Sequence, residues 1–182
     1  MTINYPVKLE IHLRPIWHNN PPKINIGIND DIKKIILSEE RSFQFEFIAS
    51  KKSIITIELL NKNDADSILD KGLDKAVIIE SVSFFNIADP RFIWAGIYEP
   101  EYPEPWATEQ RDLGVVLKPQ LTNETCLGWN GKWTLTFTVP VFTWMRWPLP
   151  APACRPLPVW AALGAGAPGG RAVAGCDAPC AD

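Results

Sequence analysis

The residues best suited to chemistry lie in one short stretch of the chain, residues 61–75. Four Asp and two Asn occur within these 15 residues, and the candidate metal ligands among them are Asn61, Asp64, Asp66 and Asp74. Hard oxygen atoms gathered on a loop suit Ca²⁺, because that ion takes about six to eight oxygen ligands in a flexible geometry. The stretch therefore predicts a calcium site.

Two features of the same stretch favour a different interpretation. The spacing is not that of an EF-hand, which needs a Glu at its last ligand position and flanking helices. Lys62, Lys71 and Lys75 also neutralise part of the negative charge. The alternative is a solvated loop whose Asp and Asn side chains cap turns.

A second group of residues is suited to binding rather than catalysis. Four aromatic residues lie beside Pro, Gly or Asn rather than inside alternating strands: Tyr98, Tyr102, Trp106 and Trp129. Exposed rings of this kind stack on the C–H faces of sugars, so we predict that these four bind ligand. The alternative for each ring is a place in the core or at a corner, which is what we expect for Trp94, Trp133, Phe137 and Trp144.

Acid–base catalysis has little material in this chain. It contains two His. The acidic residues nearest the aromatic residues lie in a proline-dense segment that predicts a solvent-exposed rim: Glu99, Glu101, Glu104 and Glu109. A glycosidase needs two carboxylates across a cleft, and no feature of the sequence pairs any two of these. We predict that the protein is not an enzyme.

The elements that position these residues are predicted to be β-strands. Apolar and polar residues alternate in Val7–Leu13, Ile24–Ile28, Phe43–Phe47 and Ile55–Leu59, and period-two alternation is typical of strands with one buried face. Val77–Phe85 is a nearly continuous apolar run, as expected of a central strand. Short strands at intervals of roughly 10 residues predict an all-β fold, an antiparallel β-sandwich of the jelly-roll kind.

The second half of the chain has a different character. Five prolines between residues 89 and 120 predict a strand at Phe92–Tyr98 and then an extended segment, Glu99–Gln110, that wraps an existing surface. Trp129-Asn130-Gly131 predicts a tight turn before a strand at Lys132–Val139. This late hairpin is expected either to complete the sandwich or to dock beside it. Helix is predicted to be scarce, with Asp64–Lys71 as the best candidate.

Composition excludes some partners and sets the last segment apart. A formal net charge of −3 gives no basic field for a phosphate backbone, so we expect no nucleic-acid partner. No apolar run is long enough to span a membrane, and the start lacks a signal peptide, so synthesis in a cytoplasm is expected.

Residues 148–182 contain seven of the 17 prolines and no Ile, Lys, Asn, Phe, Tyr or Thr. We predict a low-complexity tail, disordered or irregular, that is frameshifted or foreign; a Pro-rich interaction linker is the alternative.

Two resemblances extend this interpretation. Glu58-Leu59-Leu60-Asn61, followed by Gly72-Leu73-Asp74-Lys75 and the apolar run Ala76–Val82, resembles the end of the calcium-dependent xylan-binding carbohydrate-binding modules. The resemblance covers roughly residues 5–87 and implies a jelly roll whose loop carboxylates hold a Ca²⁺ that binds sugar hydroxyls. It implies a ligand role for Asp74, whereas Lys62 stands where the family has its first Asp.

The segment from about Phe92 to Trp144 is similar to the carboxy-terminal part of uncharacterised structural proteins of tailed bacteriophages. The similarity rests on the runs Ile97–Trp106 and Leu127–Trp144. Together the two resemblances imply a module at 5–87, an aromatic and Pro-rich extension at 88–147, and the tail at 148–182. They imply a virion location, with a polysaccharide or cell-surface glycan and other virion subunits as partners.

Two functions remain open from the sequence. The first is a non-catalytic carbohydrate-binding module, Ca²⁺-dependent through the loop, on a phage virion protein. The second is a virion structural or decoration module that packs against another subunit and binds neither sugar nor metal.

Overall fold

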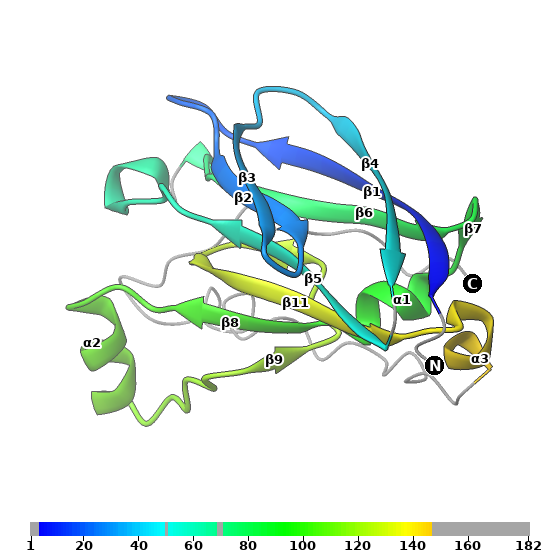
Figure 1. Ribbon diagram of the computed structural model, residues 1–182. Helices are drawn as coiled ribbons and strands as arrows, with labels where there is room; N and C mark the ends of the chain where they lie inside the picture. Colours follow the sequence, from blue (N-terminus) through cyan, green and yellow to red (C-terminus); the bar gives the residue numbers. More distant parts are fainter. Residues whose placement is uncertain (1–3, 50, 69–70, 147–182) are drawn as a thin grey trace, which may run out of the picture.

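The computed structural model describes residues 4–49, 51–68 and 71–146, and within them the chain forms an antiparallel β-sandwich (Figure 1). The predicted fold class is therefore confirmed. The predicted tail at 148–182 lies outside the described residues. None of the helices in the described part of the chain is long and apolar enough to cross a membrane.

The first sheet is built around strands from the start and the middle of the chain. Its strand order is β10-β6-β1-β4, with β7 pairing with β6. The strands are β1 (Tyr5–Ile16), β4 (Arg41–Ala49), β6 (Ala76–Phe84), β7 (Ile87–Ala88) and β10 (Cys126–Leu127). The apolar run predicted as a central strand is β6, which pairs with β1 on one side and with β10 on the other.

The second sheet has six strands in the order β3-β2-β5-β11-β8-β9. They are β2 (Lys23–Ile28), β3 (Asp31–Ile36), β5 (Lys52–Leu59), β8 (Ile97–Glu101), β9 (Leu121–Thr122) and β11 (Asn130–Thr138). Strands β2 and β3 form an antiparallel hairpin that turns at Asn29. Asn29 itself has φ 53°, a backbone conformation that Asn tolerates better than most residues.

Alternation places one face of each strand in a common core. In β1, Val7, Leu9, Ile11 and Leu13 are at most 2% exposed, and the residues between them face outward or to the rim. The core joins side chains from both sheets, and it includes residues from both halves of the chain such as Leu9, Ile57, Tyr98 and Trp133. Burial of apolar area between the two layers is therefore the main driving force for this fold.

Strand β11 lies between β5 and β8, in the middle of the second sheet. The tight hairpin predicted at Trp129-Asn130-Gly131 is wrong, because β10 pairs with β6 in one sheet and β11 with β5 and β8 in the other. Glycine is needed at position 131 because the β8 backbone approaches β11 closely there, rather than for a hairpin turn. Its φ is 139°, and a Cβ there would lie 2.3 Å from the Glu99 carbonyl oxygen of β8.

The described part of the chain contains four short helical segments: η1 (Asp64–Asp66), α1 (Pro90–Trp94), α2 (Trp106–Asp112) and, after the last described strand, α3 (Val141–Met145). The strand predicted from Phe92 is wrong, since the Asp89 side chain accepts the Arg91 N–H and Pro90 begins α1 instead. The extended segment predicted through Gln110 is also wrong. After β8 the chain turns into α2, whose Thr108 N–H donates to the Glu104 side chain.

A group of rings closes one end of the core. Phe84 makes edge contacts with Phe92, Phe137 and Trp144, with ring centroids 4.9–5.8 Å apart. Of the rings expected in the core, Trp133 and Phe137 are fully buried and Trp144 packs against Phe137. Trp94 is only half-buried, because Phe92 and Ile93 are the residues of α1 that face the core.

We expect Phe84→Ala to lower the free energy of unfolding by about 3–5 kcal/mol, because it removes a fully buried ring and leaves a cavity among three others. Urea unfolding measures the change. Ile48→Ala on β4 is the control, since that side chain is 65% exposed and its loss should cost about 0.5 kcal/mol or less. Equal costs for the two variants would contradict the assignment of Phe84 to the core.

Candidate functional site

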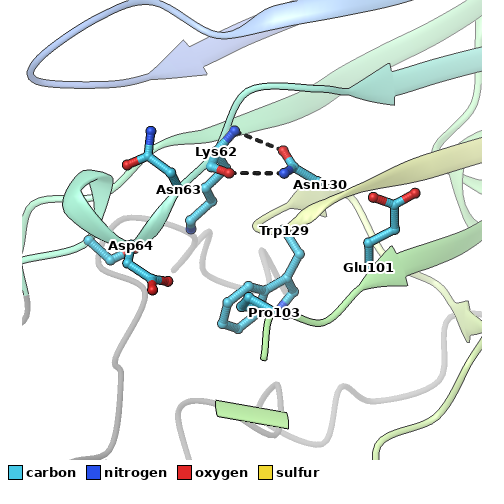
Figure 2. Close-up of a pocket in the computed structure, with 8 residues that line it drawn as sticks. Lys62, Asn63, Asp64, Glu101, Pro103, Trp129 and Asn130 are labelled. Carbon is cyan, nitrogen blue, oxygen red and sulfur yellow. Dashed lines mark hydrogen bonds between the residues drawn. The ribbon is translucent and has the colours of Figure 1, made fainter. Parts of the chain in front are cut away.

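A pocket lies where the loop after β5 meets the connection from β10 to β11 and the end of β8. Figure 2 shows Asp64 on one side of it and Glu101 on the other, with Trp129 and Pro103 between them. Eight residues line it: Lys62, Asn63, Asp64, Ser67, Glu101, Pro103, Trp129 and Asn130.

The loop is ordered first by a local cap. The Asn63 side chain accepts the Ala65 N–H at 3.0 Å, and the Asp66 carboxylate accepts the Asn63 N–H at 2.9 Å. These reciprocal bonds form a capping box around η1. They turn the Asp66 side chain inward, where it is 2% exposed.

Lys75 brings three segments of the chain together around its ammonium group. Its Nζ donates to Asp66 Oδ2 at 2.8 Å, to Asn20 Oδ1 at 2.6 Å and to the Asn61 carbonyl oxygen at 3.1 Å. The Lys75 side chain is 1% exposed. A buried ammonium is tolerated only where it is paired and hydrogen-bonded, and all three of its protons have acceptors here.

Lys62 forms a second buried ion pair a short distance along the loop. Its Nζ donates to Asp74 Oδ1 at 2.7 Å and to the Gly128 carbonyl oxygen at 2.5 Å. Ser67 Oγ donates to the same Asp74 oxygen at 2.6 Å. The side chains of Lys62 and Asp74 are 5% and 0% exposed, and Asp74 Oδ2 is buried with no hydrogen-bond partner in the described part of the chain.

Asn130, the first residue of β11, joins this loop to that strand. The Lys62 N–H donates to Asn130 Oδ1 at 2.8 Å, and Asn130 Nδ2 donates to the Lys62 carbonyl oxygen at 2.9 Å (Figure 2). The amide thus pairs with the Lys62 backbone as a neighbouring strand would. The loop and Trp129, which precedes Asn130, are held in one arrangement.

Three of the four rings predicted to bind ligand form a cluster beside the pocket. Trp106 and Trp129 lie 4.7 Å apart at 34°, and Tyr102 lies 6.0 Å and 6.2 Å from them. Lys62 Nζ is 5.2 Å from the Trp129 ring centroid, within range of a cation–π contact. Trp129 is 7% exposed, whereas Tyr102 and Trp106 are half-buried. We call Tyr102, Trp106 and Trp129 the aromatic cluster.

Tyr98 was predicted to lie on this surface, and the structure places it in the core at 1% exposure. The physical reason is the alternation of β8, whose second and fourth residues point inward. The Tyr98 hydroxyl donates to the Trp129 carbonyl oxygen at 2.7 Å and accepts the Trp129 N–H at 3.1 Å. Burial raises the pKa of this phenol, so it stays protonated and holds the Trp129 backbone.

The four predicted metal ligands do not surround one centre. Asp66 and the Asn61 carbonyl oxygen face the Lys75 ammonium, whereas the Asn61 side chain accepts the Lys23 N–H. Asp74 faces the Lys62 ammonium, and Asp64 is exposed at the pocket rim. Within residues 4–49, 51–68 and 71–146, no group of three or more His, Cys, Asp or Glu side chains is arranged to hold a metal ion. The described residues of the loop do not fit calcium, because lysines bind the oxygens that the ion would need.

The nearby glutamates take part in local structure. Glu99 accepts a hydrogen bond from Gln120, and Glu104 accepts bonds from Thr108 and Arg111. The hydrogen bond from Thr108 contributes most to a lowered pKa of Glu104, which therefore stays ionised at the start of α2.

Sequence reasoning missed the organising residues of the site. Asn130 was assigned to a turn, and Asn20 was given no role, because each acts through a partner 55 or more positions away in the sequence. The available signal was the presence of Lys62 and Lys75 within the acidic stretch. Lysines that alternate with carboxylates in a loop indicate internal ion pairs as readily as a solvated surface.

Comparisons with known proteins add one structural likeness. No protein-family model matches the chain, and no curated protein matches it. A solved structure described as "vCBM60 in complex with galactobiose" is similar, with a TM-score of 0.42 and 9% sequence identity. The match covers 72% of this chain and 97% of that chain.

We expect Tyr98→Phe to reduce the free energy of unfolding by about 1–3 kcal/mol, because the buried N–H and carbonyl groups of Trp129 both lose their partner. Tyr102→Phe is the matched control, since the Tyr102 hydroxyl donates to the Lys118 carbonyl oxygen near the surface. Chemical denaturation of the two variants measures the difference. A Tyr98→Phe protein as stable as the control would show that the hydroxyl does not position Trp129.

Proposed function

We propose that the protein binds carbohydrate without breaking bonds, and that the aromatic cluster and the adjoining pocket form the binding surface. The observation that supports this most is the arrangement of Trp106 and Trp129, whose rings lie 4.7 Å apart, with Trp129 also lining a pocket that has Asn63, Asp64 and Glu101 at its rim. Trp106 is the more accessible of the two indoles and packs against Trp129, so Trp106 is the ring that we expect to stack on a sugar.

The pocket supplies the polar contacts that a sugar needs. Asn63, Asp64 and Glu101 are exposed at its rim and carry amide and carboxylate groups that accept or donate hydrogen bonds to hydroxyls. Apolar stacking for the C–H face and a few convergent polar groups for the hydroxyls together make a carbohydrate site. A polysaccharide or a cell-surface glycan is the ligand that we propose.

The location proposed for this activity is the virion of a tailed bacteriophage. It is supported by the likeness of the runs Ile97–Trp106 and Leu127–Trp144 to phage structural proteins. These runs contain the whole aromatic cluster, so a virion subunit of this kind would present the sugar site through them.

A structural role in the virion is the second candidate, and a separate surface favours it. Phe85 and Phe142 stack at 5.3 Å, and Phe142 is 53% exposed. Ile87 on β7 is 48% exposed nearby in the sequence. Figure 1 shows β7 and α3 at the opposite end of the sandwich from α2. Apolar side chains exposed at this end suit packing against another subunit.

We expect the wild-type chain to be retained by at least one insoluble polysaccharide in a panel of xylan, mannan and galactan. We expect Trp106→Ala to bind at least about tenfold more weakly, since it removes the stacking face. Pull-down followed by binding isotherms measures this.

Trp17→Ala is the matched control, because Trp17 is 40% exposed and its indole N–H donates to the Ser38 carbonyl oxygen rather than to the aromatic cluster. It should bind like the wild type. No retention of the wild-type chain by any of the polysaccharides would contradict the proposal and favour the structural role. Equal retention of the two Trp variants would place the sugar elsewhere.

A further inference from the structure

The loop between β5 and β6 contains its own cations. The two buried carboxylates, Asp66 and Asp74, are matched by two buried ammonium groups, those of Lys75 and Lys62. Each ammonium lies among oxygen atoms at hydrogen-bonding distance, as a metal ion would. Among the described residues of the loop, the buried charges therefore balance and leave no excess negative charge to attract a divalent ion.

The surroundings of Lys75 resemble a coordination shell. Its Nζ has oxygen neighbours from Asp66, Asn20 and Asn61 at 2.6–3.1 Å. Two of these three residues, Asn61 and Asp66, are predicted metal ligands, and Asn61 contributes its backbone carbonyl oxygen rather than its side chain. Distances in this range suit N–H···O hydrogen bonds, whereas Ca²⁺ would draw its oxygens to about 2.3–2.6 Å.

Lys62 completes the arrangement on the side of the pocket. Its ammonium group neutralises Asp74, donates a hydrogen bond to the Gly128 carbonyl oxygen and lies against the Trp129 ring. The remaining Asp74 oxygen, Oδ2, is a single buried acceptor and cannot by itself supply the about six to eight oxygens that calcium requires.

We propose that Lys62 and Lys75 are the resident cations of this loop, so that the loop and the pocket wall that it forms need no divalent metal. This inference goes beyond sugar binding and stands whether or not a glycan is bound. Because the lysines are covalently attached, the site stays assembled under conditions that strip metal from a protein. Its cost is that each buried carboxylate depends on one particular lysine.

We expect the full chain to melt at the same temperature in calcium chloride and in EDTA, since a ligand that binds only the folded state would raise the melting temperature. Differential scanning calorimetry at one ionic strength measures both. A higher melting temperature in calcium would overturn the proposal, and this comparison needs no variant.

Loss of the Lys75 ammonium should be costly and should be rescued by removing its partner charge. We expect Lys75→Met to lower the melting temperature by about 10 °C, because Asp66 stays buried and unpaired. Adding Asp66→Asn to Lys75→Met should recover part of this loss. Lys71→Met is the matched control, since Lys71 lies in the same loop but is exposed, and it should melt like the wild type.

Lys75→Met as stable as Lys71→Met would overturn the proposal. So would a double variant less stable than Lys75→Met alone, because the two groups would then not act as a pair. If Lys75→Met does not fold, folding of the double variant supports the pairing; if neither variant folds, the wild-type comparison in calcium and EDTA decides.

Discussion

The burial of the Lys62 ammonium between Asp74 and the Gly128 carbonyl oxygen is the interaction on which the candidate site depends. An ion pair removed from water is stable only if the geometry is good and the remaining donors and acceptors are satisfied. This requirement fixes the loop after β5 against the connection between β10 and β11. The same contact sets the ammonium under the Trp129 ring, so the charge pair and the aromatic surface are parts of one arrangement.

The position of that contact follows from the topology. Strand β10 belongs to the first sheet and β11 to the second, so Gly128 and Trp129 lie where the chain crosses between the layers. Tyr98 on β8 holds the Trp129 backbone from within the core, and Asn130 joins the crossing to the loop. The rigid sandwich thus supports a ring whose outer neighbours, Tyr102 and Trp106, come from the less regular segment after β8.

Much of the sandwich could be predicted from alternation, because strands such as β1 and β5 bury every second residue. The helices α1 and α2 could not be predicted from such a pattern. Their sequences are short and rich in Pro and aromatic residues, and the Asp89 cap and the hydrogen bond from Thr108 to Glu104 decide the local structure. Tyr98, Trp106 and Trp129 are aromatic residues with similar sequence surroundings, but they differ in burial, since neighbours distant in the sequence determine which rings are covered. The pairing of Lys75 with Asn20 is equally beyond local patterns.

The most direct test of the account is a crystal structure of the full chain grown in millimolar calcium chloride, with anomalous scattering data collected to identify bound metal. The account predicts that the Lys75 ammonium lies among Asp66, Asn20 and Asn61, the Lys62 ammonium lies against Asp74, and no anomalous peak appears in the loop. A calcium ion bound to the Asp66 and Asp74 carboxylates, with the two lysines turned out to solvent, would contradict it.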